Sequence, residues 1–436
     1  MDKHKRVNMS DVLGFVLGGG DGKRLRPLTK DRSKLAVPIA GNQRIIDFVL
    51  TNFVRSDIKK IFVTIYYKSD SLTNHIEENW KFLPTQLGQF IRVLPPQKRT
   101  EDDDAYEGSA GAIHQNRHLL DVHHPKIVAV FSGDHVYYMD IRDMVEYHLS
   151  EDADATICAL PMKTSDAPRE ADGRFSYGVI VADENGKVID FQEKPHNPIE
   201  IPSRPGYFWA AMGNYVFKRQ ILQKVLEDDH EDDGSRHDFG RNIMPRLVHD
   251  KKNVYMYDFS TNEIPDMTEN ERGYWADIGN IDSYYDVNMM LASVSPKINL
   301  YNKSWALMKP ASKTVHSATI RHDLEEHKKK KIAGVYDSLI AEGCIISGAT
   351  ILNSVISSST NVHSYSMIVD SIMLGDTDIG EDCQIKNAII DKHVKIPSHT
   401  MIGYDLDLDE SRGFKVVRDR GIVVVPRAYK FDEIQK

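Results

Sequence analysis

The feature of this sequence that most restricts its fold is an internal repeat near its C-terminal end. Aligning the segment from Ser338 onward with itself gives a shift of 17 residues, which places aliphatic residues in three registers. The registers are Ile345, Val362, Ile379 and Ile396; Ile351, Ile368, Ile385 and Ile402; and Val355, Ile372 and Ile389. Small or polar pairs recur at the same shift, namely Asn353-Ser354, Asp370-Ser371 and Asn387-Ala388. Three apolar rows with polar corners predict the stacked coils of a parallel β-helix, because each coil buries its inward aliphatics against its neighbours.

The preceding part of the chain has a different pattern, which predicts an α/β layer. Apolar runs that lack polar alternation predict buried strands at residues 12–17, 59–66, 126–134 and 154–160. Apolar residues at helical spacing predict helices at residues 44–56 and 140–150. We therefore expect an α/β domain over residues 1–300, a linker over 301–335 and the β-helix domain over 336–436.

Composition excludes several classes of protein. A net charge of -9 argues against broad binding to nucleic acid or to acidic membranes, since both require a basic surface. The apolar runs are far shorter than the roughly 20 residues that a membrane span needs. Three widely spaced cysteines, Cys158, Cys344 and Cys383, fit neither a disulfide framework nor a metal site, so we expect a cytoplasmic protein.

The strongest local motif is a glycine-rich loop after the first predicted strand. Gly18, Gly19, Gly20 and Gly22 are followed by the basic residues Lys23, Arg24 and Arg26. Glycines let backbone N–H groups approach phosphate oxygens, and nearby cations complement the charge, so the loop predicts a phosphate site. It matches neither the Walker loop nor G-x-G-x-x-G. A purely structural turn remains the alternative interpretation.

Three further positions gain meaning from their place in the chain. Asp134 follows a buried apolar run, and ligands of α/β sheets bind beyond the carboxyl ends of strands. Its carboxylate suits Mg²⁺, although an Asp after Gly equally suits a turn. Lys194 follows another predicted strand and Asp277 precedes a predicted helix, but neither has a specific meaning alone.

Taken together, ordered motifs of this sequence resemble those of the sugar-nucleotide pyrophosphorylases, and in particular the ADP-glucose pyrophosphorylase branch. The motifs are LGGGDGKRLRPLT with Lys34, SGDHVY, FQEKP, AAMGNYVF, HDFGRNIMP and WADIGNIDSYY. The resemblance implies a Rossmann-like nucleotidyltransferase domain followed by a left-handed parallel β-helix, assembled as a homotetramer. It also implies adenylyl transfer from ATP to α-D-glucose 1-phosphate, with Mg²⁺, for glycogen synthesis.

The resemblance also implies residue roles. Arg24, Lys34 and Asp134 would be catalytic, and Asp134 and Asp277 would bind Mg²⁺. The residues that would bind the sugar phosphate are Lys194, Glu193, Gly178, Met212 and Gly213. The residues that would bind the nucleotide are Leu17, Gly18, Gly19, Gly20, Gly22, Gln97, Tyr106, Gly108 and Ser109.

Three alternatives remain open. Asp21 and Glu107 stand where the family carries other residues, so the chain fits either a non-catalytic regulatory subunit or a pyrophosphorylase for another nucleotide or sugar. The third alternative is acyltransfer by the β-helix, with His363, His393 or His399 as the base. Arg32 and the lysines at 328–331 are candidates for an anionic effector.

Overall fold

The computed structural model describes residues 8–20, 22–96, 106–308, 316–321 and 334–431. The chain divides into two compact units. The first comprises residues 1–21, 48–275 and 302–306, and the second comprises residues 22–47, 276–301 and 307–436. The first β-helix strand, β14 (Thr319–Arg321), falls inside the interval predicted as a linker, and the domain boundaries stay a prediction.

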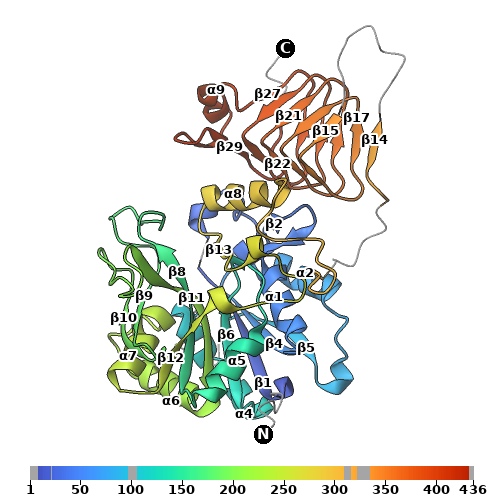
Figure 1. Ribbon diagram of the computed structural model, residues 1–436. Coiled ribbons are helices and arrows are strands. Elements are labelled where there is room, and N and C mark those ends of the chain that lie inside the picture. The colour runs from blue at the N-terminus through green and yellow to red at the C-terminus, as the bar shows by residue number, and fades with distance from the viewer. Residues whose placement is uncertain (1–7, 21, 97–105, 309–315, 322–333, 432–436) are drawn as a thin grey trace. The chain divides into compact units, whose positions relative to one another are not determined.

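A nine-stranded sheet is the centre of the first unit (Figure 1). Its main path runs β10-β9-β11-β6-β1-β4-β5, with β8 paired to β11 and β12 paired to β8. The strands are β1 (Val12–Gly18), β4 (Lys60–Ile65), β5 (Phe90–Leu94), β6 (Ile127–Ser132), β8 (Ala155–Lys163), β9 (Val179–Ala182), β10 (Val188–Gln192), β11 (Tyr207–Lys218) and β12 (Val254–Asp258). Strands β6, β1, β4 and β5 are parallel, whereas β11 is antiparallel to β6, β8 and β9. The predicted mixed sheet is confirmed.

Helices cover both faces of this sheet. His148 of α5 (Ile141–Ser150) bonds to Thr156 of β8, whereas Ala155 and Ile157 of the same strand join a core cluster with α6 (Arg219–His230) and α7 (Met244–His249). Successive strand residues point to opposite faces, so α5 and the α6–α7 pair lie on opposite sides. Other helices of the chain are α1 (Ile45–Arg55), α2 (Ser69–Asn79), α3 (Gly108–His114) and α4 (His118–His123).

Short elements complete the catalytic part of the chain. The 3-10 turns are Met9–Asp11, Lys23–Leu25, Lys34–Ala36, Thr85–Leu87, Phe259–Thr261 and Glu269–Glu271, and a π-helical turn covers Phe239–Ile243. The short strands are β2 (Pro38–Ile39), β3 (Gln43–Arg44), β7 (His135–Val136) and β13 (Ala276–Asp277). The second unit also contains α8 (Ile281–Ala292), which Asn280 and Ser283 cap reciprocally.

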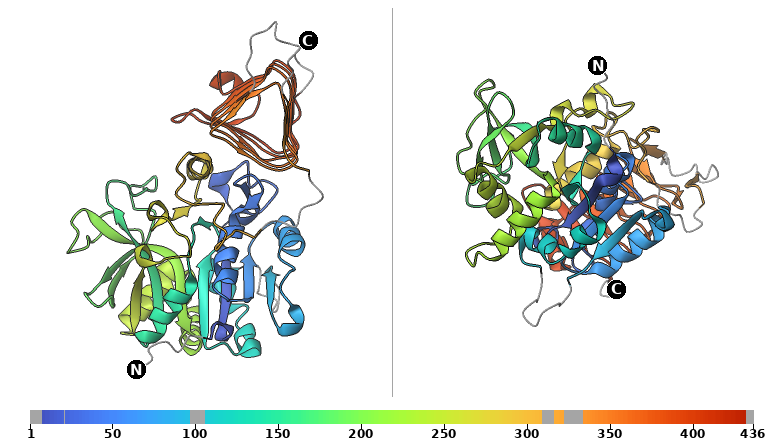
Figure 2. Two further views of the ribbon diagram at one scale, coloured as in Figure 1. Left: turned by 45° about the vertical axis from the view of Figure 1, so that its right-hand side comes forward. Right: turned by 90° about the horizontal axis from the view of Figure 1, so that it is seen from below.

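The second unit contains the predicted parallel β-helix. Three sheets of short strands run β14-β17-β20-β23-β26, β15-β18-β21-β24-β27 and β16-β19-β22-β25-β29-β28, and Figure 2 shows their triangular outline. Their strands pair in parallel except for β28, which is antiparallel to β29. After β14 the strands are β15 (Gly334–Tyr336), β16 (Leu339–Ile340), β17 (Ile345–Ser347), β18 (Thr350–Leu352), β19 (Val355–Ile356), β20 (Asn361–Val362), β21 (Met367–Val369), β22 (Ile372–Met373), β23 (Asp378–Ile379), β24 (Gln384–Lys386), β25 (Ala388–Ile390), β26 (Lys395–Ile396) and β27 (Met401–Ile402). Helix α9 (Leu406–Ser411), β28 (Lys415–Val417) and β29 (Ile422–Val425) follow.

Two of the three predicted registers are confirmed, and one residue of the other is wrong. Ile351, Ile368, Ile385 and Ile402 pair in one row, and Val355, Ile372 and Ile389 in another. In the remaining row, Val362 pairs with Ile346 rather than with Ile345. Ile346 is buried, whereas Ile345 is 39% exposed. The reason is that the coil from β17 to β20 is one residue shorter than the 17-residue repeat.

The predicted polar corners are confirmed. Asn353, Asp370 and Asn387 have φ of 45°, 47° and 47°, in the left-handed region where Asn and Asp are the favoured non-glycine residues. The hydroxyls of Ser354 and Ser371 each accept the N–H of the residue one coil further on, at 3.1 and 3.2 Å. A single polar side chain per coil therefore satisfies the backbone where the chain turns.

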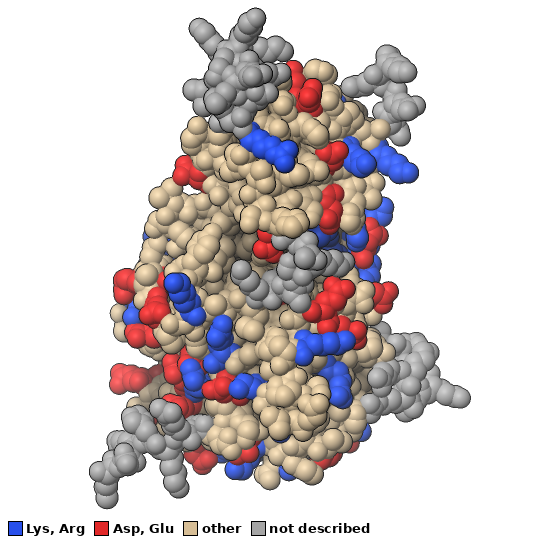
Figure 3. Space-filling view, turned by 90° about the vertical axis from the view of Figure 1, so that its right-hand side faces the viewer, with Lys and Arg blue, Asp and Glu red and all other residues tan. Residues whose placement is uncertain are grey.

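Two surface properties bear on function. Among the helices of the described residues, none is both long and apolar enough to cross a bilayer. In Figure 3, basic and acidic side chains are interspersed over the face in view. An anionic substrate must therefore be attracted by a local arrangement of cations rather than by the net field of the protein.

Candidate active site

The carboxyl ends of β1 and β6 lie side by side and place two predicted site segments together. Leu17 is opposite Ser132 in the parallel register, and the N–H of Gly133 donates to the carbonyl of Leu17 at 3.0 Å. The segment that leads to Asp134 therefore starts beside the end of β1, where the chain continues into Gly18, Gly19 and Gly20. A Cβ at Gly19 or Gly20 would meet no atom of the described residues within 4 Å, so there is open space at these two positions of the loop.

Asp134 lies beside a ring cluster that includes unsatisfied polar atoms. Its carboxylate is 17% exposed and lies 3.5 Å from Nε2 of His135, whose ring packs edge-on against Trp275 at 5.0 Å between centroids. The Nδ1 of His135 and the Nε1 of Trp275 are buried and have no hydrogen-bond partner among the residues that the structure describes. Buried polar groups of this kind are costly unless a ligand or water satisfies them, so both atoms are available to a bound substrate.

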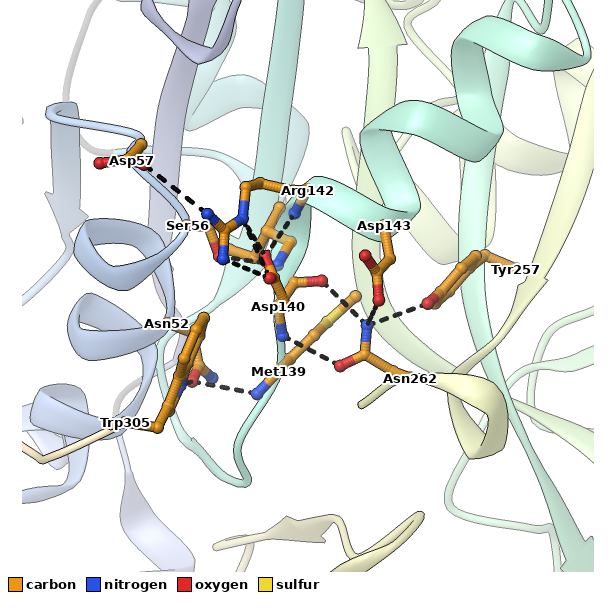
Figure 4. A network of polar contacts seen from close by, with 11 residues as sticks. Asn52, Ser56, Asp57, Met139, Asp140, Arg142, Asp143, Tyr257, Asn262 and Trp305 are labelled. Atoms are coloured by element: carbon orange, nitrogen blue, oxygen red, sulfur yellow. Dashed lines mark hydrogen bonds and ion pairs between the residues drawn. The ribbon is translucent and has the colours of Figure 1, made fainter. Parts of the chain in front are cut away.

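The segment that follows His135 is fixed by buried amide side chains (Figure 4). Asn52 of α1 donates to the carbonyl of Tyr137 at 3.1 Å and accepts the N–H of Met139 at 3.1 Å. Asn262 accepts the N–H of Asp140 at 2.9 Å and donates to its carbonyl at 2.9 Å. Each amide pairs a donor and an acceptor of the same stretch of backbone, and this stretch in turn positions Asp134.

The predicted sugar-phosphate residues of β11 lie next to the same loop. The register of β11 against β8 shifts between Ala211 and Tyr215, which forms a bulge at Met212 and Gly213. Gly213 has φ of 69°, and a Cβ there would lie 3.3 Å from Oγ of Ser132 and 3.8 Å from Cε1 of His135. The bulge therefore brings bare backbone against the Ser132–His135 segment, where a side chain would intrude. Met212 itself is buried.

Glu193 and Gly178 lie together at the end of β10. A Cβ at Gly178 would be 3.4 Å from Oε2 of Glu193, and one at Gly240 would be 2.8 Å from the same oxygen. Burial and the neighbouring Asp238 carboxylate raise the pKa of Glu193, while Lys194 opposes that shift. Lys194 has φ of 45°, and its Nζ lies 3.3 Å from Oε1 of Glu170. The structure thus brings Gly178, Glu193 and Lys194 together as predicted.

The predicted nucleotide segment packs on the loop that contains Asp238. The Oγ of Ser109 donates to Asp238 at 3.0 Å and accepts the N–H of Phe239 at 3.0 Å. A Cβ at Gly108 would lie 2.2 Å from the carbonyl oxygens of Arg236 and His237, so this position requires glycine. Asp238 therefore lies between the nucleotide segment and Glu193. Asp238 belongs to the HDFG motif, but no role for it was predicted from the sequence.

Tyr106 is placed differently from a ligand-contacting side chain. It is 5% exposed, and its hydroxyl donates to the carbonyls of Leu94 and Pro95 and accepts from Asn116. Its ring lies edge-on to Tyr66. Tyr106 therefore fixes the start of α3 rather than presenting its hydroxyl. Gln97 lies outside the described residues.

In the second unit, the predicted cations and the predicted metal ligand converge. The Nζ of Lys34 is 3.6 Å from Oδ1 of Asp277, and these side chains are 11% and 25% exposed. A Cβ at Gly279 would lie 3.6 Å from Oδ2 of Asp277 and 3.8 Å from Nη2 of Arg24. Gly22 is left-handed at φ of 64°, and the hydroxyl of Thr29 donates to its carbonyl at 2.7 Å, which fixes the turn before Arg24. Arg24 and Asp277 thus approach the same glycine, and Lys34 pairs with the same carboxylate.

Of the residues predicted to bind an anionic effector, the structure describes Arg32, which is engaged in an ion pair inside the fold. Arg32 is buried, and its Nη2 donates to both carboxylate oxygens of Asp391 at 2.6 Å. The positive charge of its guanidinium is therefore balanced by the Asp391 carboxylate within the fold. The lysines at 328–331 lie outside the described residues. His393 and His399 occupy left-handed corners of the β-helix, at φ of 61° and 64°.

Comparisons with known proteins show the family to which the chain belongs. A family model described as nucleotidyl transferase matches residues 13–294, and one described as GlmU-like, C-terminal hexapeptide matches residues 318–425. A curated glucose-1-phosphate adenylyltransferase of Thermus thermophilus is 44% identical over 97% of this chain and 99% of its own length. The proteins of that name from Deinococcus radiodurans, and numbered 2 from Vibrio cholerae, are each 40% identical, over 96% and 97% of this chain and 99% of their own lengths. The chain therefore belongs to the nucleotidyltransferase family, in the branch of the glucose-1-phosphate adenylyltransferases.

Proposed function

We propose that this protein transfers the adenylyl group of ATP to α-D-glucose 1-phosphate, giving ADP-glucose and pyrophosphate for glycogen synthesis. The observation that carries the proposal is the 44% identity to a glucose-1-phosphate adenylyltransferase over nearly the full length of both chains. Charged groups suited to this reaction gather within each unit: Lys34 with Asp277 in the second, and Glu193 with Lys194 in the first. No covalent intermediate is required for such a transfer.

The triphosphate is held by backbone and by fixed cations. Gly18, Gly19 and Gly20 offer N–H groups, and at Gly19 and Gly20 a phosphate can approach without meeting a described side chain. Arg24 follows closely along the chain and supplies a planar guanidinium, whereas Lys34 supplies a compact point charge. We assign to both cations the stabilisation of the pyrophosphate as it departs.

Nucleotidyltransferases of this kind use a divalent metal ion, and we propose Mg²⁺ with Asp134 and Asp277 as its ligands. Partly exposed carboxylates are the hard oxygen ligands that Mg²⁺ prefers, and the ion usually keeps several waters. When bound, Mg²⁺ would offset the negative charge that two polyanions bring together. Lys34 lies beside Asp277, so the same carboxylate also orients a phosphate-binding cation.

The sugar phosphate binds at the end of β10. Lys194 contacts its phosphate, while Glu193, next to the bare backbone of Gly178, accepts hydrogen bonds from sugar hydroxyls. The phosphate oxygen then attacks the α-phosphorus of ATP in line, and pyrophosphate leaves. Holding both reactants in this geometry is worth up to about 7–11 kcal/mol of the barrier in general.

A substrate panel tests the reaction. Purified protein is assayed for pyrophosphate release with ATP, GTP, UTP or dTTP against glucose, N-acetylglucosamine or mannose 1-phosphate. We expect turnover with ATP and glucose 1-phosphate, dependent on Mg²⁺. A clear preference for another pair would replace the assigned substrates, and no turnover with any pair would favour the regulatory-subunit alternative.

Two matched variants test the metal assignment. Asp277→Asn is expected to abolish Mg²⁺-dependent turnover, because the amide cannot replace an anionic ligand. Asp286→Asn removes a carboxylate of the same unit that pairs with Arg420 at 2.6 Å on the surface, and it should retain activity. Equal activity of the two variants would remove Asp277 from the site.

We also propose that the protein assembles as a homotetramer in the cytoplasm and responds to an anionic metabolite. Light scattering coupled to size exclusion measures the oligomer. We expect fructose 1,6-bisphosphate to activate less than about tenfold, since Asp31 and Leu35 replace the lysine and proline common in activated relatives, and larger activation would refute this expectation.

A further inference from the structure

Lys194 is held by an acidic residue, Glu170, that has no part in the proposed reaction. Its Nζ lies 3.3 Å from Oε1 of Glu170, and the two side chains are 33% and 26% exposed. Glu170 comes from the hairpin that precedes β9, whereas Lys194 follows β10. The contact therefore links two different loops at the edge of the sugar-phosphate region.

The hairpin that contains Glu170 is closed on itself. Arg169 and Phe175 form an isolated antiparallel bridge. The N–H of Glu170 donates to the carbonyl of Arg174 at 2.8 Å, and the N–H of Gly173 donates to the carbonyl of Glu170 at 2.9 Å. Because both backbone groups of Glu170 are bonded within the turn, its carboxylate starts from a fixed position.

The same hairpin is clasped to the loop of Lys194 by two contacts independent of the ion pair. The N–H of buried Phe175 donates to the carbonyl of Pro195 at 2.9 Å. Nη1 of Arg169 donates to the carbonyl of His196 at 3.3 Å, and its guanidinium stacks on the Phe175 ring at 3.9 Å. Glu170 and Lys194 thus face each other from two loops that are already tied together.

Lys194 also needs external orientation. Its φ of 45° places the backbone in the left-handed region, and its four-carbon side chain has many rotamers. An ammonium has three donors, so a carboxylate that takes one of them leaves two for the oxygens of a phosphate. Glu170 therefore orients the ammonium without consuming its capacity to bind.

We propose that Glu170 is a positioning residue for the sugar phosphate: it holds the Lys194 ammonium in the orientation that receives the phosphate of glucose 1-phosphate. The inference rests on the proposed function. It deepens that function, because it makes the affinity for the sugar phosphate depend on a residue outside the phosphate's own contacts. The affinity for ATP is not expected to depend on it.

The test compares Glu170→Gln with Asp172→Asn. Asp172 lies on the same hairpin but pairs with Arg174, at 2.7 Å, so its substitution controls for the loss of an acidic side chain there. For Glu170→Gln we expect the KM for glucose 1-phosphate to rise by about five- to twentyfold, as for a partly exposed charge-assisted hydrogen bond. The kcat, the KM for ATP and the melting temperature should stay within twofold or a few degrees of the Asp172→Asn values.

The outcomes separate the two levels of the proposal. If wild-type protein turns over glucose 1-phosphate and Glu170→Gln leaves its KM unchanged, Glu170 does not position Lys194. A lower KM would mean that Glu170 competes with the phosphate, and a joint loss of kcat, both KM values and stability would mean a structural role; either result overturns the inference. If wild-type protein neither turns over nor binds glucose 1-phosphate in calorimetry, the proposed function fails first, and the inference fails with it.

Discussion

Replacing Asp391 by alanine should destabilise the second unit more than any exposed charge change. Asp391 and Arg32 are 1% and 3% exposed, and one guanidinium nitrogen donates to both carboxylate oxygens at 2.6 Å. The two residues are 359 positions apart, so the pair joins the segment before α1 to the end of the β-helix repeat. Removing the carboxylate would leave Arg32 buried without its counter-ion.

The magnitude follows from burial and from the neighbouring charges. Breaking a buried pair by deleting one partner costs about 3–5 kcal/mol, because the remaining charge is uncompensated. A second cation shares this environment: burial, followed by Arg32, lowers the pKa of Arg44 to about 10, and the carboxylates of Asp47 and then Asp391 oppose that effect. For a unit of about 150–250 residues this loss corresponds to roughly 6–20 °C in melting temperature.

Differential scanning calorimetry at fixed scan rate measures the effect. The matched control is Asp286→Ala, which removes the exposed partner of Arg420 and should cost about 1 kcal/mol or less. The double variant Arg32→Met, Asp391→Leu should recover most of the loss, because apolar side chains of similar volume often replace buried ion pairs without penalty. An Asp391→Ala melting temperature equal to that of the control would refute the reasoning.

Three further predictions concern the first unit. Burial lowers the pKa of His148 from 6.5 to about 4, so between pH 6.5 and pH 4 the imidazole takes up a proton in the unfolded state but not in the folded state. The free energy of unfolding should therefore fall by about 3 kcal/mol as the pH is lowered through that range. His148→Asn should flatten the dependence of melting temperature on pH. Asn262→Ala orphans the N–H and carbonyl of Asp140 and should cost about 2–5 kcal/mol in chemical denaturation, with loss of activity; an unchanged midpoint would contradict the role given to this amide. Gly108→Ala should lower the melting temperature strongly, because its Cβ would lie 2.2 Å from two carbonyl oxygens, whereas Gly19→Ala meets nothing within 4 Å and should melt like wild type.

Much of the fold could be predicted from periodicity. The strands predicted at residues 12–17 and 59–66 are β1 and β4, and the helix predicted at 140–150 is α5, each within about one residue. The repeat predicted the β-helix because its period is a property of each coil. The register predicted for Ile345 was wrong because the coil there is one residue shorter, and a constant shift of 17 residues assumes that all coils have the same length.

The site could be predicted less completely, for a physical reason. Motifs with local chemistry, such as the glycine loop with Arg24 or the strand end with Asp134, carry their signal in adjacent residues. Asp238 carries none: its importance comes from contacts with Ser109, 129 positions away, and with Glu193 through space. Nothing in the sequence near Asp238 distinguishes it from the cap of a helical turn, which it also is.

Glu170 and Asn262 show the same limit for residues that act through others. Each satisfies a group elsewhere in the chain, Lys194 in one case and the backbone of Asp140 in the other. Such residues belong to no recognisable sequence motif, because the group that each of them binds comes close to it only when the chain folds. The groups assigned to substrate contact are therefore the ones that motifs predict, whereas the groups that hold them in place become evident only in the folded structure.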